Sequence, residues 1–183
     1  MRLKYLFKIQ NIIDNEIRRI CQEDGSVIDR IHLIKTQILA LEVKTGELAN
    51  ITKCYKYPQQ MKAVEKRKLI IRYVDCFKFL LSIGNDNQFN VVNFSVKELI
   101  ESVTKDPCET IVDVFLSLFD HISNLKRDLV TENYISGVGV YMTIFKEFVL
   151  IGQLLGLTFE DVFDYYDNIY RDMVHKAEPP AEQ

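Results

Sequence analysis

The sequence predicts an all-α protein, a helical bundle that forms a single domain over residues 1–176. Apolar residues recur every three or four positions through long stretches that the 7 Gly and 4 Pro residues rarely interrupt, which is helical spacing. Hydrophobic residues make up 48% of the chain and charged residues 27%, a balance that excludes a disordered chain. A length of 183 residues suits one domain with a full core. The tail, residues 177–183, contains two prolines and is expected to be disordered.

Three helices are expected in the first half of the chain, over residues 3–21, 27–55 and 59–83. Pro58 separates the second helix from the third, because proline lacks the amide that the next helical turn would use. Gly84 is expected to stop the third helix, since glycine commonly follows the last helical residue.

The second half begins with residues 89–94, which we predict to be a loop. Four helices are then expected, over residues 95–103, 106–125, 134–155 and 158–176. Ser95 and Glu98 have the spacing of a capping box, and Thr158 with Asp161 repeats this signal at the start of the last helix.

The overall charge argues against binding to polyanions and membranes. Lys plus Arg is 23 and Asp plus Glu is 26, so the formal net charge is 23 − 26 = −3, which disfavours nucleic acid as a partner. No apolar run reaches the roughly 20 residues that span a bilayer. Lys4 and Lys8 interrupt the only candidate for a signal sequence, so we expect no membrane association and a cytoplasmic location.

The cysteines and histidines do not form a recognisable metal or catalytic pattern. The 4 Cys and 3 His residues are scattered, without a CxxC pair or a histidine spaced to complete a zinc site. We interpret the cysteines as reduced packing residues and expect no histidine-centred chemistry.

Four charged residues stand in the apolar stripes of the second and third helices. Lys44 and Glu47 are three residues apart, and so are Arg72 and Asp75, so each pair lies on one helix face. Isolated buried charges cost several kcal/mol each, so the four must pair with one another or line a wetted cleft. The alternative is that they are ordinary surface charges at the stripe edges.

Four segments of the chain resemble motifs of a known family. They are LFKIQNIID (residues 6–14), ILALEVKTGELANITKCYKY (38–57), YVDCFKFLLSIG (73–84) and FKEFVLIGQLLGLTFEDV (145–162). Together they resemble the dimeric all-α dUTPase family, relatives of the MazG-type NTP pyrophosphohydrolases. The resemblance covers roughly residues 6–176 and implies the family's all-α fold and a homodimer.

Members of that family hydrolyse dUTP to dUMP and pyrophosphate with Mg²⁺ ions held by carboxylates in an ExxE...ExxD pattern. The corresponding positions in this chain are Lys44, Glu47, Arg72 and Asp75, so two anions are replaced by two cations. The resemblance therefore implies a degenerate site. We expect no metal or other cofactor and no intact catalytic residues.

The resemblance also assigns nucleotide-binding positions. Gln10 corresponds to the glutamine that holds uracil, Lys56 belongs to the motif that ends the second helix, and Tyr166 aligns in the last motif. Other positions that serve the substrate in the family have changed, and in this chain they read Pro58, Lys78, Ile169, Tyr170 and Met173.

These departures predict a catalytically inactive dUTPase-like protein that acts through protein–protein interaction or regulation, with an unidentified protein partner. Some phage members of the family bind repressors of mobile elements, so a regulatory role of that kind is a plausible parallel. One alternative is an active pyrophosphatase with Mg²⁺ on Glu47 and Asp75 and with Glu42 or Asp86 recruited, although Glu42 lies about 200° around the helix from Lys44. A second alternative is a sensor that binds deoxyuridine nucleotides without hydrolysis.

Overall fold

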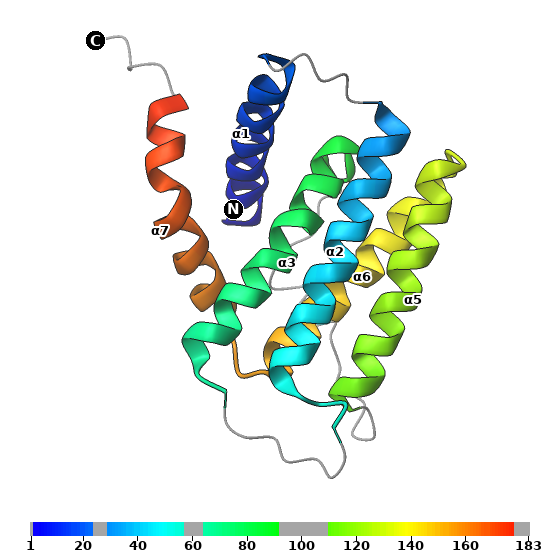
Figure 1. Cartoon of the computed structure of the whole chain (residues 1–183), viewed down its shortest axis with the longest axis vertical. Helices are drawn as coiled ribbons and strands as arrows, with labels where there is room; N and C mark the ends of the chain where they lie inside the picture. The colour runs from blue at the N-terminus through cyan, green and yellow to red at the C-terminus, as the bar shows by residue number, and fades with distance from the viewer. Residues whose placement is uncertain (1, 24–28, 57–63, 92–109, 178–183) are drawn as a thin grey trace.

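The computed structural model describes residues 2–23, 29–56, 64–91 and 110–177. In those ranges the chain forms a bundle of α-helices and no strand, as the sequence predicts (Figure 1). The elements are α1 (Arg2–Glu23), α2 (Arg30–Thr52), α3 (Lys66–Asp86), the 3₁₀ turn η1 (Phe89–Val91), α5 (Ile111–Val130), α6 (Tyr134–Leu154) and α7 (Phe159–Ala177). The predicted helix 95–103 lies outside the described residues, as do Pro58 and most of the predicted tail.

Helix α2 is shorter at both ends than the predicted span 27–55, because capping residues bound it. The Asp29 side chain accepts a hydrogen bond from the His32 amide at 2.9 Å, so the helix begins at Arg30. Lys53 follows the last helical residue with a φ of 54°, the left-handed conformation that ends a helix.

Helix α3 runs through Gly84 and ends two residues later, so the prediction that Gly84 stops the helix is wrong. A Cβ built on Gly84 would overlap the Tyr141 hydroxyl and lie 2.9 Å from the Phe7 ring. That hydroxyl donates to the Leu80 carbonyl oxygen at 3.0 Å. Gly84 is therefore a packing glycine that lets α1 and α6 approach α3.

Capping boxes start both α5 and α7. Thr110 and Asp113 exchange hydrogen bonds, with the Thr110 amide 2.9 Å from the Asp113 carboxylate, so α5 begins at Ile111 and its end lies five residues past the predicted one. The predicted box of Thr158 and Asp161 is confirmed, with the Asp161 amide 3.1 Å from the Thr158 hydroxyl. α7 then extends to Ala177, one residue beyond the predicted end.

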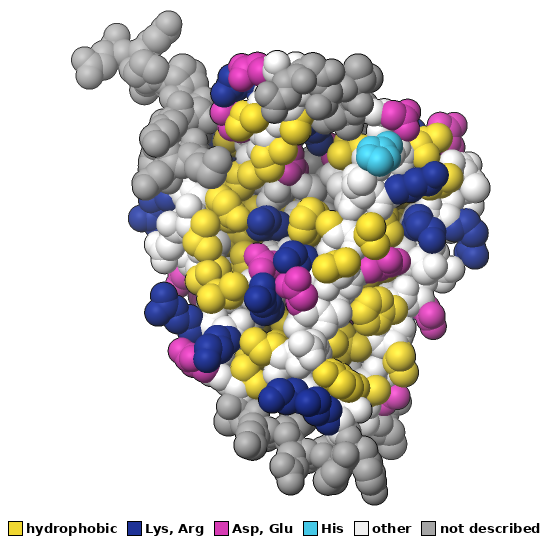
Figure 2. Space-filling model, viewed as in Figure 1, with side chains coloured by type: hydrophobic (Ala, Val, Ile, Leu, Met, Phe, Trp, Pro, Cys, Tyr) yellow, Lys and Arg dark blue, Asp and Glu magenta, His cyan; other side chains and the backbone are white. Residues whose placement is uncertain are grey.

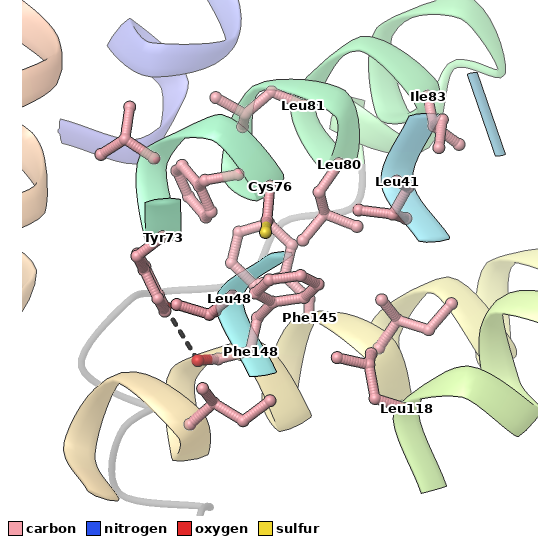
Figure 3. Close-up of a cluster of buried hydrophobic side chains, with 14 of the residues drawn as sticks. Leu41, Leu48, Tyr73, Cys76, Leu80, Leu81, Ile83, Leu118, Phe145 and Phe148 are labelled. Atoms are coloured by element: carbon pink, nitrogen blue, oxygen red, sulfur yellow. Dashed lines mark hydrogen bonds between the residues drawn. The ribbon is translucent and has the colours of Figure 1, made fainter. Parts of the chain in front are cut away.

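The bundle is centred on α2 and α3. In Figure 1, α5 lies to one side of this pair, α1 and α7 lie to the other, and α6 passes behind α2. The core beneath α2 and α3 is aromatic: Figure 3 shows Tyr73, Phe145 and Phe148 packed together, with the Tyr73 hydroxyl donating to the Phe148 carbonyl oxygen at 2.8 Å. Both phenylalanines are fully buried.

Helix α6 supplies much of this core. Among the described helices it is the one long and apolar enough to cross a membrane by length and composition alone. The side chains of Tyr141, Ile144 and Ile151 are nevertheless fully buried inside the bundle. Its apolar composition thus serves packing against α3 and α5.

Candidate functional site

The four charged residues picked out from the sequence meet across α2 and α3. Lys44 Nζ lies 3.1 Å from both carboxylate oxygens of Glu47. Arg72 Nη1 crosses from α3 to Glu47 Oε2 at 3.1 Å and also reaches Asp75 Oδ2 at 3.3 Å. Glu47 is therefore the shared anion of the cluster. Figure 2 shows acidic and basic side chains together at the middle of this face.

The cluster is partly exposed, so its four charges pair with one another at the surface and not in the interior. Side-chain exposure is 29% for Lys44 and Asp75, 37% for Glu47 and 43% for Arg72. The reason is that α2 and α3 pack through apolar residues underneath, including the fully buried Leu48 and Cys76. The charged groups extend past this contact to the surface.

The donor set fits Mg²⁺ poorly. Mg²⁺ prefers oxygen ligands, and this cluster offers two carboxylates, each within 3.3 Å of a cation. Asp86, one of the residues considered as a recruited ligand, pairs with Arg18 and accepts from Gln37 Nε2 at 2.7 Å. In the described part of the chain, no group of three His, Cys, Asp or Glu side chains is placed to hold a metal ion.

Gln10 and Tyr166, two of the predicted nucleotide-binding residues, meet in the interior. Gln10 is 3% exposed, and its Oε1 accepts a hydrogen bond from the fully buried Tyr166 hydroxyl. Its Nε2 donates to Asp14 Oδ1 at 2.7 Å and to Ser82 Oγ at 3.2 Å. Both ends of the Gln10 amide are thus engaged within the protein.

Lys56 is placed apart from that pair. Its side chain is exposed in the turn that follows α2, where its amide donates to the Lys53 carbonyl oxygen at 3.0 Å. No hydrogen bond joins Lys56 to Gln10 or Tyr166 in the residues that the structure describes. The structure therefore brings together two of the three predicted nucleotide-binding residues.

Asp14 is a functional candidate that the sequence reasoning missed. Burial raises the pKa of its carboxyl, and the hydrogen bonds from Ser82 and Gln10 only partly oppose this effect. The Ser82 hydroxyl donates to Asp14 Oδ2 at 2.5 Å. The available signal was its position four residues after Gln10, which places it on the same face of α1.

Three polar side chains that bind neighbouring helices lie along one stripe of α3. Asp75, Ser82 and Asp86 are spaced seven and four residues apart and share a helix face. Asp75 belongs to the charge cluster with α2, Ser82 contacts α1, and Asp86 contacts both α1 and α2. Each of these three polar groups thus has a partner within the protein.

Lys78 and Tyr170, at two other positions that serve the substrate in the family, also contact side chains of the protein. Lys78 Nζ lies 5.9 Å from the centroid of the Tyr170 ring and 6.0 Å from that of Phe79. The Tyr170 ring packs on Tyr166 with a centroid separation of 4.9 Å. Lys78 and Tyr170 thus form a cation–aromatic contact between α3 and α7.

Comparison with known proteins agrees with this architecture. No curated protein and no solved structure matches the chain significantly. A family model described as dUTPase matches residues 2–171, which is nearly the entire sequence. With its all-helical bundle, the chain therefore belongs to the all-α dUTPase family.

Proposed function

We propose that this chain is a catalytically inactive member of its family that acts through protein–protein interaction or regulation. The observation that carries the proposal is the pairing of Glu47 and Asp75 with Arg72, and of Glu47 with Lys44, at 3.1–3.3 Å. The two remaining carboxylates are neutralised by side chains of the same site. A divalent cation gains little by entering it.

The chemistry of the family explains why this loss is decisive. Hydrolysis of a triphosphate needs positive charge on the phosphoryl oxygens and an activated water, and bound metal ions supply both. The cations of this site are held by carboxylates at hydrogen-bond distance, so they are poorly placed to replace a metal. Lys78 and Tyr170 stand at positions that the resemblance assigns to the substrate, and here the two side chains contact each other.

A hydrolysis assay and calorimetry on the same sample test the proposal. With dUTP and Mg²⁺, we expect no pyrophosphate release above that of the Asp75→Ala variant and no magnesium-dependent heat of binding. Release that requires Mg²⁺ and disappears in Asp75→Ala would instead establish the active-enzyme alternative. Magnesium-independent binding of dUMP would favour the nucleotide sensor, and it requires Gln10 to exchange its internal hydrogen bonds for uracil.

Besides an unidentified protein partner, we propose that the chain pairs with a second copy of itself. Leu39 and Val43 lie one turn apart on α2 and are 58% and 50% exposed, and Leu116 on the neighbouring α5 is 61% exposed. Exposed apolar side chains on two adjoining helices are typical of an interface. The homodimer that the family resemblance implies supports the same pairing.

A further inference from the structure

The part of the chain where α2 ends and α3 begins is strongly basic. Residues 53–68 contain six Lys or Arg residues and one Asp or Glu, a net charge of 6 − 1 = +5. Because the formal charge of the whole chain is −3, the other residues sum to −3 − 5 = −8. Figure 1 shows the last turn of α2 and the first turn of α3 at the same end of the bundle. A chain that is acidic overall therefore has a basic surface at this end.

Five exposed cations form the described part of this surface, which we call the basic end: Lys53, Lys56, Lys66, Arg67 and Lys68. Figure 2 shows Lys and Arg side chains gathered toward the lower end of the molecule. Lys66 lies 2.8 Å from Asp161, and Lys68 lies 3.4 Å from Glu65. The other three cations take part in no ion pair within the residues that the structure describes. Their charges are available to a binding partner.

The cations at the start of α3 do not stabilise the helix. The amino end of a helix dipole is positive and favours acidic residues, yet the first turn of α3 holds Lys66, Arg67 and Lys68 and no acid. Glu65, the residue before the helix, makes no side-chain hydrogen bond that caps it. Three cations at this place raise the positive potential and weaken the helix locally. Binding of an anionic partner explains them better than folding does.

We propose that the basic end binds an acidic segment of a partner protein, an inference that rests on the proposed role in protein–protein interaction and names the chemistry of the partner. Carboxylates match Lys and Arg side chains and the amides in the first turn of a helix. Tyr55 lies between Lys53 and Lys56 and is 58% exposed. Its hydroxyl donates to Asn50 Oδ1 at 2.7 Å, so the ring is held in place. Tyrosine and arginine are enriched in protein interfaces.

A protein segment suits this surface better than a nucleic acid or a membrane does. Glu65 and Asp161 lie beside lysines of the basic end, and both carboxylates would repel a continuous row of phosphates. The charge of −8 on the rest of the chain would also repel an extended polyanion or an anionic bilayer. A short acidic segment contacts the basic end alone and avoids most of this repulsion.

Fluorescence anisotropy of a labelled decaglutamate peptide, titrated with the full chain at low ionic strength, tests the surface. The variant Lys53→Gln plus Arg67→Gln is compared with Lys35→Gln plus Lys126→Gln, which removes the same charge from exposed positions on α2 and α5. We expect the control pair to bind the peptide as the parent does. The basic-end pair should have a dissociation constant at least about fivefold higher, because two exposed charge contacts are lost.

Two further measurements separate a loss of binding from a loss of structure. Lys53→Arg plus Arg67→Lys keeps both charges and should bind the peptide as the parent does. Without peptide, the melting midpoint of Lys53→Gln plus Arg67→Gln should equal or exceed that of the parent, because a cation is removed from the positive end of the α3 dipole.

Equal affinities for the basic-end and control pairs overturn the proposal, as does the absence of peptide binding at about 1 mM protein. Tighter binding of decathymidylate or of phosphatidylserine vesicles, lost in Lys53→Gln plus Arg67→Gln, would assign the surface to a polyanion and also overturn it. The dUTP hydrolysis assay on the same samples keeps the two proposals apart. Peptide binding fails alone if neither binding nor hydrolysis is seen, whereas Mg²⁺-dependent hydrolysis by a chain that binds the peptide contradicts only the inactivity.

Discussion

Arg72 on α3 donates to Glu47 on α2 at 3.1 Å, and this is the contact that joins the two halves of the charge cluster. Both side chains stand at positions where the resemblance to the family implies metal-binding carboxylates. The pair links the two helices directly, through side chains of the protein itself. Because both groups are partly exposed, solvent weakens their attraction.

The first prediction concerns the stability that this cluster contributes. Glu47→Gln should lower the free energy of unfolding by about 1 kcal/mol or less, since exposed ion pairs contribute about 0–1 kcal/mol. Asp75→Asn should cost less than Glu47→Gln, because Glu47 pairs with both cations. Urea unfolding measures both, with Glu42→Gln on the same helix as the control. A loss of about 3 kcal/mol or more would mean that the cluster behaves as a buried one.

The second prediction concerns recovery of metal binding. Lys44→Glu plus Arg72→Glu restores four carboxylates at the family's ligand positions and should destabilise the protein without Mg²⁺ through mutual repulsion. Added Mg²⁺ should then raise the melting midpoint of this variant, with a stabilisation of about 2.7 kcal/mol at a hundred times its dissociation constant. We expect only weak dUTP hydrolysis, because Lys78 and Tyr170 remain at positions that serve the substrate in the family and contact each other there.

The matched control for that experiment is Lys35→Glu plus Arg67→Glu, which makes the same charge change at exposed positions on α2 and α3. Its melting midpoint should not depend on Mg²⁺. A similar response in both variants would point to general charge screening rather than to a restored metal site.

The third prediction is a pH dependence that arises from Asp14. Burial raises its pKa in the folded state, so the native protein binds this proton more tightly than the unfolded chain does. The resulting stability is present below the unfolded pKa of about 3.9 and is lost as the pH rises through the folded pKa. Asp14→Asn removes the ionisable group while keeping the shape of the side chain. The free energy of unfolding of this variant should therefore fall less than that of the parent over this rise in pH.

Unfolding in urea at a series of pH values measures this difference. Asp164→Asn, at an exposed position on α7, is the control and should keep the parent's pH profile. Identical profiles for the parent and Asp14→Asn would show that the Asp14 carboxyl titrates alike in the folded and unfolded states.

The fourth prediction compares two helical glycines. Gly84→Ala should destabilise the protein by about 1–3 kcal/mol, because the added methyl group overlaps the Tyr141 hydroxyl in a packed core. Gly139→Ala has no atom within 4 Å of the new Cβ and should be neutral or stabilising by up to about 1 kcal/mol, since alanine favours the helix. Thermal unfolding of both variants decides, and equal effects would mean that α1 and α6 readjust around Gly84.

The fifth prediction tests the proposed dimer. Sedimentation at micromolar concentration should give a species of twice 21.4 kDa, and Leu39→Asp plus Leu116→Asp should convert it to a monomer by placing charges in the interface. Ile135→Asp, at a position 92% exposed in the first turn of α6, is the control. A parent protein that sediments as a monomer would contradict the proposed interface.

Local signals in the sequence predicted the helices well. The box of Thr158 and Asp161 sets the start of α7 because its hydrogen bonds join residues three apart, and such contacts depend little on the rest of the fold. The all-helical class follows from apolar spacing in the same way. The equal spacing in the two charged pairs, read with the family resemblance, identified residues that do meet.

By itself, then, the sequence determined the helical class, one capping box and the membership of the charge cluster. Only the tertiary structure decided that Gly84 packs against Tyr141, 57 positions further along the chain, and that Ser82 donates to Asp14. It also decided that the side chains of the charge cluster are partly exposed to solvent. The physical reason is that helix periodicity and capping act over about four residues, whereas burial and pairing between helices depend on packing between distant segments.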